Sequence, residues 1–200
     1  DFGSVASRSG CRRSGRFALL RFYDTSITFF EREIFMTGLI HILTGNGKGK
    51  TTSATGMAVR ALGNGLKVTF VQFLKGTPTG EVKTLEKLEN VEIIRCNRAT
   101  SFDYDNIPLL KETHNEMLLS AIETQPDMLI LDEVIGAVNY GYLDKDILLD
   151  YLKNHNNTEV VMTGRNAPDY LIDLADYVSE IYPVKHPYKR GIKARKGIEY

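Results

Sequence analysis

A glycine-rich segment between an apolar run and a helical pattern constrains this chain most. Residues 44–52 read Thr-Gly-Asn-Gly-Lys-Gly-Lys-Thr-Thr; the apolar run 39–43 precedes them and a helical pattern covers 50–62. Glycines let a backbone adopt positive φ and turn its N–H groups inward, and the following helix adds positive partial charge. Strand, loop and helix therefore stand in the order of a phosphate loop, so we expect the chain to bind ATP here.

The residues of this loop have predicted roles in holding a triphosphate. Lys50 can reach the distal phosphates, and the hydroxyl of Thr51 can bind Mg²⁺. The standard pattern begins with glycine where this chain has Thr44. We therefore expect nucleotide binding without ordinary transfer of the γ-phosphate. The predicted ATP-binding residues of the loop are Gly45, Asn46, Gly47, Lys48, Gly49, Lys50, Thr51 and Thr52.

An acidic pair at the end of a second apolar run supports the metal prediction. Residues 128–133 read Met-Leu-Ile-Leu-Asp-Glu, an apolar strand that ends in two carboxylates. Such a pair can hold Mg²⁺ beside a phosphate loop. Thr51, Asp132 and Glu133 are therefore the predicted metal ligands, and the pattern leaves open which carboxylate binds the ion directly.

Apolar runs and helical patterns alternate from residue 38 onward, which predicts an α/β fold with a mostly parallel sheet and helices on both faces. The segment 96–106 has no clean period and is expected to be a loop. We expect His41 and His114 to be structural and His155 to lie at the surface. The expected strands are 39–43, 67–73, 91–95, 128–131, 159–162 and 177–182, and the expected helices 50–62, 81–88, 108–124, 143–152 and 168–175.

Residues 1–35 have a different composition from the rest of the chain. The first 22 residues are rich in Ser and Arg and contain one acid, Asp1, as a mitochondrial transit peptide would. Met36 stands just before the first patterned strand. We expect 1–35 to be an extension outside the fold (a misassigned start, a tag or a targeting segment) and 36–200 to form one domain.

Charge and cysteine usage narrow the class of protein. The formal net charge is zero, which argues against a polyanion such as nucleic acid as the main partner. No apolar run approaches the length of a membrane span. Cys11 and Cys96 have no metal-ligand spacing and favour a reducing, cytoplasmic setting. The basic segment 185–196 would, taken alone, be a solvated tail.

Four segments, taken together in their order along the chain, resemble one family. They are GLIHILTGNGKGKTTSATGMAVRALGNGLKV (38–68), LILDEVIGAVNYGYL (129–143), TGRNAP (163–168) and VKHPYKRGIKARKGIEY (184–200). The chain resembles the ATP:corrinoid adenosyltransferases of the cobalamin-synthesis type over residues 38–200.

The resemblance implies a RecA-like phosphate-loop domain, usually in a homodimer, that adenosylates a corrinoid. In that reaction Co(I) of the reduced corrinoid attacks the ribose 5′ carbon of ATP, and triphosphate leaves. ATP is then a co-substrate, Mg²⁺ a cofactor, and an electron donor such as a flavoprotein a partner. Because the corrinoid supplies the nucleophile, the protein must neutralise and position the leaving group. Lys50 and Glu133 are the predicted catalytic residues.

The resemblance also implies roles outside the loop. Arg165, after an expected strand, is predicted to contact the nucleotide. Family members carry Phe-x-Trp after the third strand, where this chain has Phe102-Asp103-Tyr104 and no Trp at all. The predicted corrinoid-binding residues are Phe102, Tyr104, Lys185 and His186.

Two other functions remain as alternatives. A nucleoside kinase of the thymidine kinase type shares the loop but normally carries a C-terminal zinc site built from cysteines, and this chain has no cysteine after Cys96. A RecA-like ATP-binding protein without catalysis is the second alternative, and salt-dependent binding to single-stranded DNA would support it.

Overall fold

The computed structural model describes residues 37–76, 79–96 and 106–199. The chain divides into the units Asp1–Phe35 and Met36–Tyr200, and all described residues belong to the second. The prediction that residues 1–35 are an extension outside the fold falls outside the described residues and stays a prediction.

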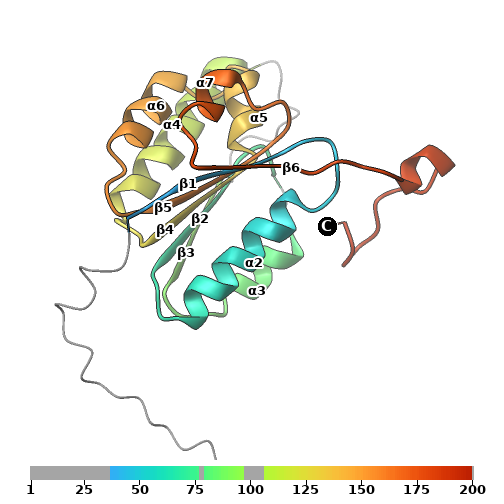
Figure 1. The fold of residues 1–200 in the computed structure, drawn as a ribbon, viewed down its shortest axis with the longest axis horizontal. Coiled ribbons are helices and arrows are strands. Elements are labelled where there is room, and N and C mark those ends of the chain that lie inside the picture. Colours follow the sequence, from blue (N-terminus) through green and yellow to red (C-terminus); the bar gives the residue numbers. More distant parts are fainter. Residues whose placement is uncertain (1–36, 77–78, 97–105, 200) are drawn as a thin grey trace, which may run out of the picture. The chain divides into compact units, whose positions relative to one another are not determined.

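A single sheet of six parallel strands organises the described residues (Figure 1). The strand order is β3-β2-β4-β5-β1-β6, and each neighbouring pair is parallel. The prediction of an α/β fold with a mostly parallel sheet is confirmed. The strands are β1 (Ile40–Thr44), β2 (Val68–Gln72), β3 (Val91–Arg95), β4 (Met128–Asp132), β5 (Glu159–Thr163) and β6 (Tyr177–Glu180).

Helices cover both faces of this sheet, as expected. Figure 1 shows α2 and α3 on one face and α4, α5, α6 and α7 on the other. The helices are α2 (Lys50–Gly63), α3 (Gly80–Leu85), α4 (Ile107–Glu123), α5 (Val134–Asn139), α6 (Lys145–Lys153), α7 (Asp169–Ile172) and the 3₁₀ helix η2 (Pro187–Arg190). The short helix α5 was not among the predicted elements.

The two faces of the sheet are packed differently. Helix α2 faces the sheet with three buried alanines, at helical spacings of four and three residues: Ala54, Ala58 and Ala61. Small side chains let a helix approach the sheet closely, which brings its N-terminus near the strand ends. The opposite face holds the larger core cluster, in which Leu118 of α4 and Leu148 of α6 are fully buried. Most of the buried hydrophobic residues belong to this larger cluster.

The carboxyl ends of all six strands meet at one edge of the sheet, because the strands are parallel. Strand β5 lies between β1, which leads into the phosphate loop, and β4, which ends at Asp132. Every residue of β4 and β2 is buried, as expected for the centre of a parallel sheet. The site must therefore form from side chains at the strand ends and in the loops that follow them.

Some predicted features differ from the structure. The expected helix 168–175 is shortened to α7, because the chain turns into β6 where the carboxylate of Asp176 accepts a hydrogen bond from the Ile40 N–H at 2.8 Å. His155, which was expected at the surface, is only partly exposed. The ring of His155 is half-buried, with Nδ1 2.7 Å from the Leu152 carbonyl and Nε2 3.0 Å from that of Gly38.

His41 and His114 have structural contacts, as predicted. His114 of α4 is buried, with Nδ1 3.0 Å from the carbonyl of Tyr142. Burial lowers the pKa of His114 and favours its neutral ring. His41 of β1 pairs with the carboxylate of Glu159 on β5 and stacks on the ring of Tyr177 on β6. These contacts join strands and helices away from the phosphate loop.

Candidate active site

The phosphate loop closes around the side chain of Lys50. Gly45 and Gly49 adopt positive φ of 96° and 126°, which a residue with a Cβ rarely adopts. The Lys50 Nζ donates hydrogen bonds to the carbonyls of Gly45 at 2.8 Å and Gly47 at 3.0 Å. Burial lowers the pKa of the Lys50 ammonium, and the nearby Glu133 carboxylate opposes that shift. The Lys50 side chain is thus enclosed by the backbone of the loop.

A buried carboxylate lies next to the loop at the end of β4. The side chain of Asp132 is fully buried, and its Oδ1 accepts hydrogen bonds from Thr51 Oγ1 at 2.8 Å and from Thr163 Oγ1 at 2.7 Å. Its Oδ2 accepts from Lys75 Nζ at 2.7 Å and from Gln72 Nε2 at 3.4 Å. Asp132 therefore joins the ends of β2, β4 and β5 to the first turn of α2.

Glu133, the second acid of the pair, has an unusual backbone conformation. It adopts left-handed φ and ψ of 62° and 17° and caps the start of α5. Its N–H donates to Thr163 Oγ1 at 2.9 Å. Burial raises the pKa of the Glu133 carboxyl, and the adjacent Asp132 raises it further. A left-handed non-glycine residue is costly, and such residues gather at functional sites.

The predicted metal ligands have the chemistry that Mg²⁺ requires. Thr51, Asp132 and Glu133 offer a hydroxyl and two carboxylates, which are the hard oxygen donors that this ion prefers. Within the described ranges, no three His, Cys, Asp or Glu side chains come together as a metal site by themselves. Three protein oxygens are fewer than the octahedral set that Mg²⁺ takes, so an ion held here would need further ligands from phosphate or water.

Thr44 is tied to the loop that follows β5. Its Oγ1 accepts a hydrogen bond from the N–H of Ala167 at 3.3 Å. In the same loop, a Cβ on Gly164 would lie 2.7 Å from the Cβ of Ile135, so only glycine fits there. The threonine in place of the usual glycine thus connects the phosphate loop to the TGRNAP segment.

Arg165 of that segment is exposed but close to the acidic pair. Its charge opposes the burial that raises the pKa of Glu133, and it adds to the burial that lowers the pKa of Lys50. The backbone carbonyl of Arg165 accepts a hydrogen bond from Asn139 Nδ2 at 3.2 Å, which anchors the residue on the end of α5. Its guanidinium is therefore available to a ligand at this edge of the sheet.

The chain after β6 lies against the phosphate loop. The N–H of Gly47 donates to the carbonyl of Ile181 at 2.7 Å, and the N–H of Ile181 donates to that of Thr44 at 2.9 Å. A Cβ on Gly45 or Gly47 would lie within 2.5 Å or 2.7 Å of the Ile181 carbonyl oxygen. These glycines therefore also allow the close approach of a second segment, a role that the sequence did not indicate.

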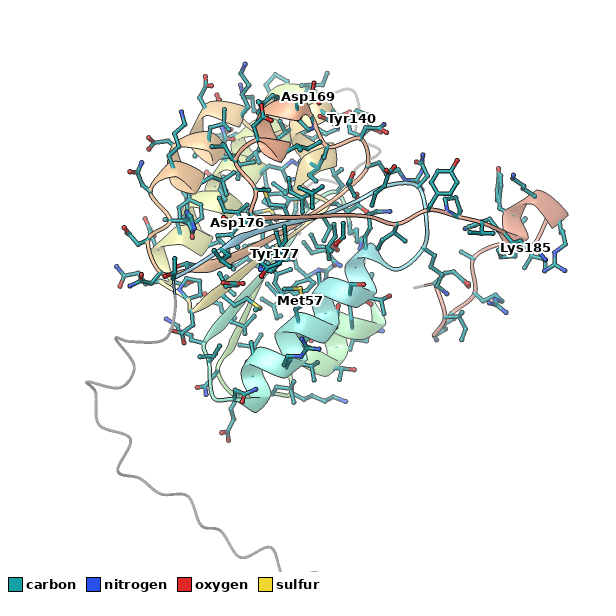
Figure 2. All side chains as sticks on the ribbon, viewed as in Figure 1. Met57, Tyr140, Asp169, Asp176, Tyr177 and Lys185 are labelled. Atoms are coloured by element: carbon teal, nitrogen blue, oxygen red, sulfur yellow. The ribbon has the colours of Figure 1, made fainter. Side chains whose placement is uncertain are left out.

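The last residues of the basic C-terminal segment contact the phosphate loop. Lys48 Nζ lies 3.2 Å from Glu199 Oε1, and Glu199 also pairs with Arg195 at 3.1 Å. Hydrogen bonds from Arg195 hold the pKa of the Glu199 carboxyl at about 2. Lys185 and His186 are exposed, and Figure 2 shows Lys185 on the stretch that leads away from the sheet.

The sequence comparisons agree with this geometry. The sequence model of the family described as ATP:corrinoid adenosyltransferase BtuR/CobO/CobP matches residues 36–200. The chain belongs to the ATP:corrinoid adenosyltransferase family. The predicted family membership is confirmed, and the matches favour adenosyl transfer over the nucleoside kinase alternative.

Individual members of the adenosyltransferase family are similar over most of their length. The corrinoid adenosyltransferase of Escherichia coli (strain K12) is 41% identical over 174 residues, covering 82% of this chain and 86% of that protein. The corrinoid adenosyltransferase CobA of Salmonella typhimurium is 40% identical with the same coverage. The Pseudomonas aeruginosa corrinoid adenosyltransferase is 37% identical and covered over 84% of its length.

The structure places the predicted site residues of this adenosyltransferase in three groups. Lys50, Thr51, Asp132 and Glu133 come together, and Arg165 lies close to them. Among the described residues, no hydrogen bond or ion pair joins Lys185 or His186 to the loop, and His186 Nδ1 instead accepts from the N–H of Tyr188 at 3.2 Å. Phe102 and Tyr104 lie outside the described residues. Of the remaining loop residues, Asn46, Lys48 and Thr52 are exposed.

Three residues of the site were missed by reasoning from the sequence. Gln72, Lys75 and Thr163 all bind Asp132, and each stands at or just beyond the carboxyl end of a strand next to β4 or the loop. The polar ends of otherwise apolar runs, as in KVTFVQF and EVVMT, were the available signal.

In the described part of the chain, no helix has both the length and the apolar character needed to cross a bilayer.

Proposed function

We propose that this chain transfers the 5′-deoxyadenosyl group of ATP to the Co(I) centre of a reduced corrinoid and releases triphosphate. The observation that carries the proposal is the cluster of Lys50, Thr51, Asp132 and Glu133 at the phosphate loop, in a chain of this family. The cluster supports binding of a magnesium triphosphate, and the family description supports the fate of the adenosyl group.

The reaction needs charge neutralisation more than proton transfer. A bond forms between cobalt and the ribose 5′ carbon, using the electron pair of Co(I), while the bond from that carbon to the triphosphate oxygen breaks. The leaving oxygen takes both electrons of the broken bond. Fixed positive charge beside that oxygen therefore lowers the barrier, provided that the 5′ carbon is held in line with cobalt.

Lys50 is proposed as the main residue that neutralises the leaving group. Its ammonium is buried within the loop, where charge–charge interactions are stronger than in water. In the presence of triphosphate it would exchange its loop carbonyl acceptors for phosphate oxygens. Lys48 and Arg165, both exposed, are proposed to add further positive charge to the same ligand.

Thr51, Asp132 and Glu133 are proposed to hold Mg²⁺. The ion would supply Lewis-acid stabilisation of the triphosphate as it leaves. The Asp132 carboxylate already accepts a hydrogen bond from the Thr51 hydroxyl, so these two proposed metal ligands are held together without the ion. Glu133 is proposed as the second catalytic residue because its carboxyl is close enough to Asp132, Lys75 and Lys50 for their charges to shift its pKa.

The corrinoid side of the reaction is proposed from the family resemblance alone. Phe102, Tyr104, Lys185 and His186 are the proposed contacts to the corrinoid. A homodimer, an electron donor such as a flavoprotein, and a cytoplasmic setting complete the proposal.

Product analysis tests the proposed function directly. The full chain is incubated with ATP, Mg²⁺, a corrinoid and a chemical reductant, and the corrinoid spectrum and phosphate products are followed. Formation of an adenosylcorrinoid with release of triphosphate is the expected result. Formation of ADP with a phosphorylated nucleoside would instead favour the kinase, and ATP binding without any product would favour the non-catalytic alternative.

A further inference from the structure

A lysine that the proposed reaction does not use binds two of the proposed metal ligands. Lys75 Nζ lies 2.7 Å from Asp132 Oδ2 and 3.3 Å from Thr51 Oγ1. Lys75 follows β2 by three residues and comes directly after Leu74, whose φ of 56° is left-handed. The carbonyl of Lys75 accepts from Arg95 Nη2 at 3.5 Å, so the backbone at this point is also held.

Asp132 has no spare acceptor position in this arrangement. Its two oxygens accept four donors, from Thr51, Thr163, Lys75 and Gln72, and a carboxylate has about four lone-pair sites. A divalent cation can therefore bind the Asp132 carboxylate only if one of these donors leaves.

Thr51 is itself a proposed metal ligand, and of the other three donors Lys75 can leave most easily. Thr163 and Gln72 are fully buried, and Gln72 is further held by Arg95 Nε at 3.1 Å and by Thr79 Oγ1 at 3.3 Å. Lys75 is 26% exposed at its side chain and carries the head group on a flexible four-carbon stem. It also carries a positive charge, which repels a second cation at the same oxygens.

We propose that Lys75 is a positioning residue that competes with the divalent cation for Asp132 and Thr51. This inference rests on the proposed function, because it concerns the proposed magnesium site. The Lys75 ammonium compensates the buried carboxylate and lowers the affinity of the site for a cation alone. Triphosphate brings negative charge to the same edge, where the released ammonium can bind. Cation and triphosphate binding are therefore coupled through Lys75.

An ordinary structural ion pair makes a different prediction. If Lys75 only stabilised the fold, its replacement would lower the unfolding temperature and leave the coupling between cation and triphosphate unchanged. Competition predicts that removing the ammonium raises the affinity for the cation alone. Triphosphate then enhances cation binding less, because there is no longer a lysine for it to draw away from the Asp132 carboxylate.

The experiment measures Mn²⁺ binding by electron paramagnetic resonance, with and without inorganic triphosphate, for the full chain and its variants. Lys75→Met removes the charge while keeping much of the stem, and Lys75→Gln is a second neutral variant in case the first does not fold. Lys75→Arg keeps the charge. Lys83→Met on the exposed side of α3 is the matched control.

The neutral variants should bind Mn²⁺ alone about tenfold more tightly, because the positive charge that competes for the Asp132 and Thr51 oxygens is removed. The enhancement of Mn²⁺ binding by triphosphate should fall by a similar factor. Lys75→Arg and Lys83→Met should match the wild type in both quantities.

Equal Mn²⁺ affinity and equal triphosphate enhancement in the wild type and the neutral variants would overturn the competition. Absence of Mn²⁺ binding by the wild type, with and without triphosphate, would overturn both the competition and the proposed metal site. The adenosyl-transfer assay is independent of this titration, so failure of the competition alone leaves the proposed reaction standing.

Discussion

The phosphate loop and the C-terminal segment 181–199 both combine glycine with lysine, yet their surroundings differ. The loop is held between β1 and α2, and Lys50 is buried among its own carbonyls. In the C-terminal segment the side chains of Tyr182, Val184 and Tyr188 are 77%, 88% and 77% exposed.

The two regions meet at only two described places. Ile181 exchanges backbone hydrogen bonds with the loop, and Glu199 pairs with Lys48. Between these points the basic side chains are exposed. The difference teaches that a segment of glycine and lysine has a predictable backbone conformation when a strand precedes it and a helix follows it. Without such neighbours it predicts only charge.

The largest effect is expected from Lys50→Ala. Adenosylation should fall at least about a hundredfold, because the buried ammonium that neutralises the leaving triphosphate is removed. The fold should be retained, since Lys50 bonds only to carbonyls of its own loop among the contacts described. Arg60→Ala, an exposed cation on the same helix, is the control for turnover and circular dichroism. Near-normal turnover of the lysine variant would refute the leaving-group role.

Asp132→Asn should damage both stability and turnover. The neutral amide has one acceptor oxygen where the carboxylate accepts four donors, so buried groups lose partners. We expect a loss of about 1–3 kcal/mol in the free energy of unfolding, measured in urea. Turnover should fall at least about tenfold through the metal site. Asp150→Asn, at an exposed position of α6, should change neither quantity.

Gly47→Ala tests the place where the loop and the C-terminal segment meet. The added methyl would lie 2.7 Å from the Ile181 carbonyl oxygen and from its Cγ2, so one backbone must move. We expect a loss of about 1–3 kcal/mol in the free energy of unfolding and weaker ATP binding. Gly56→Ala on α2 has open space and should stabilise the chain by about 0.5–1 kcal/mol. Unchanged ATP affinity in Gly47→Ala would mean that the segment does not support the loop.

The smallest effect on stability is expected from Glu199→Gln. The carboxylate pairs with Lys48 and Arg195 at the surface, where ion pairs contribute little. The unfolding temperature should not change measurably. The pKa of the Glu199 carboxyl is lowered to about 2, so this carboxylate stays ionised at pH values where an ordinary glutamate is already protonated. Its ion pairs should therefore be lost only as the pH falls to about 2. ATP affinity should rise slightly as Lys48 is released; a fall would show that Glu199 assists the ligand.

Local patterns predicted the parts of the site that lie close together in the chain. The loop from Thr44 to Thr52 was predicted because the strand before it, its glycine-rich turn and the helix after it are consecutive in the sequence. The acids Asp132 and Glu133 were predicted because they end an apolar run. In both cases, hydrophobic period and turn chemistry are properties of a short window.

Other elements could not be predicted in this way. The helix α5 has six residues, begins at a left-handed Glu133 and contains Gly136, so no apolar period marks it. Thr51, Lys75 and Thr163 contact Asp132 from 81, 57 and 31 residues away in the sequence. These contacts depend on the order of the strands in the sheet, which a local pattern does not contain.

By itself, the sequence determined that this chain is an α/β protein with a phosphate loop, an acidic strand end and the segments of one adenosyltransferase family. The tertiary structure decided which other side chains share the buried carboxylate of Asp132, and that Ile181 lies against the loop. The physical reason is burial. A carboxylate removed from water must find donors wherever the fold supplies them, and the parallel strand ends brought Lys75 and Thr163 to it.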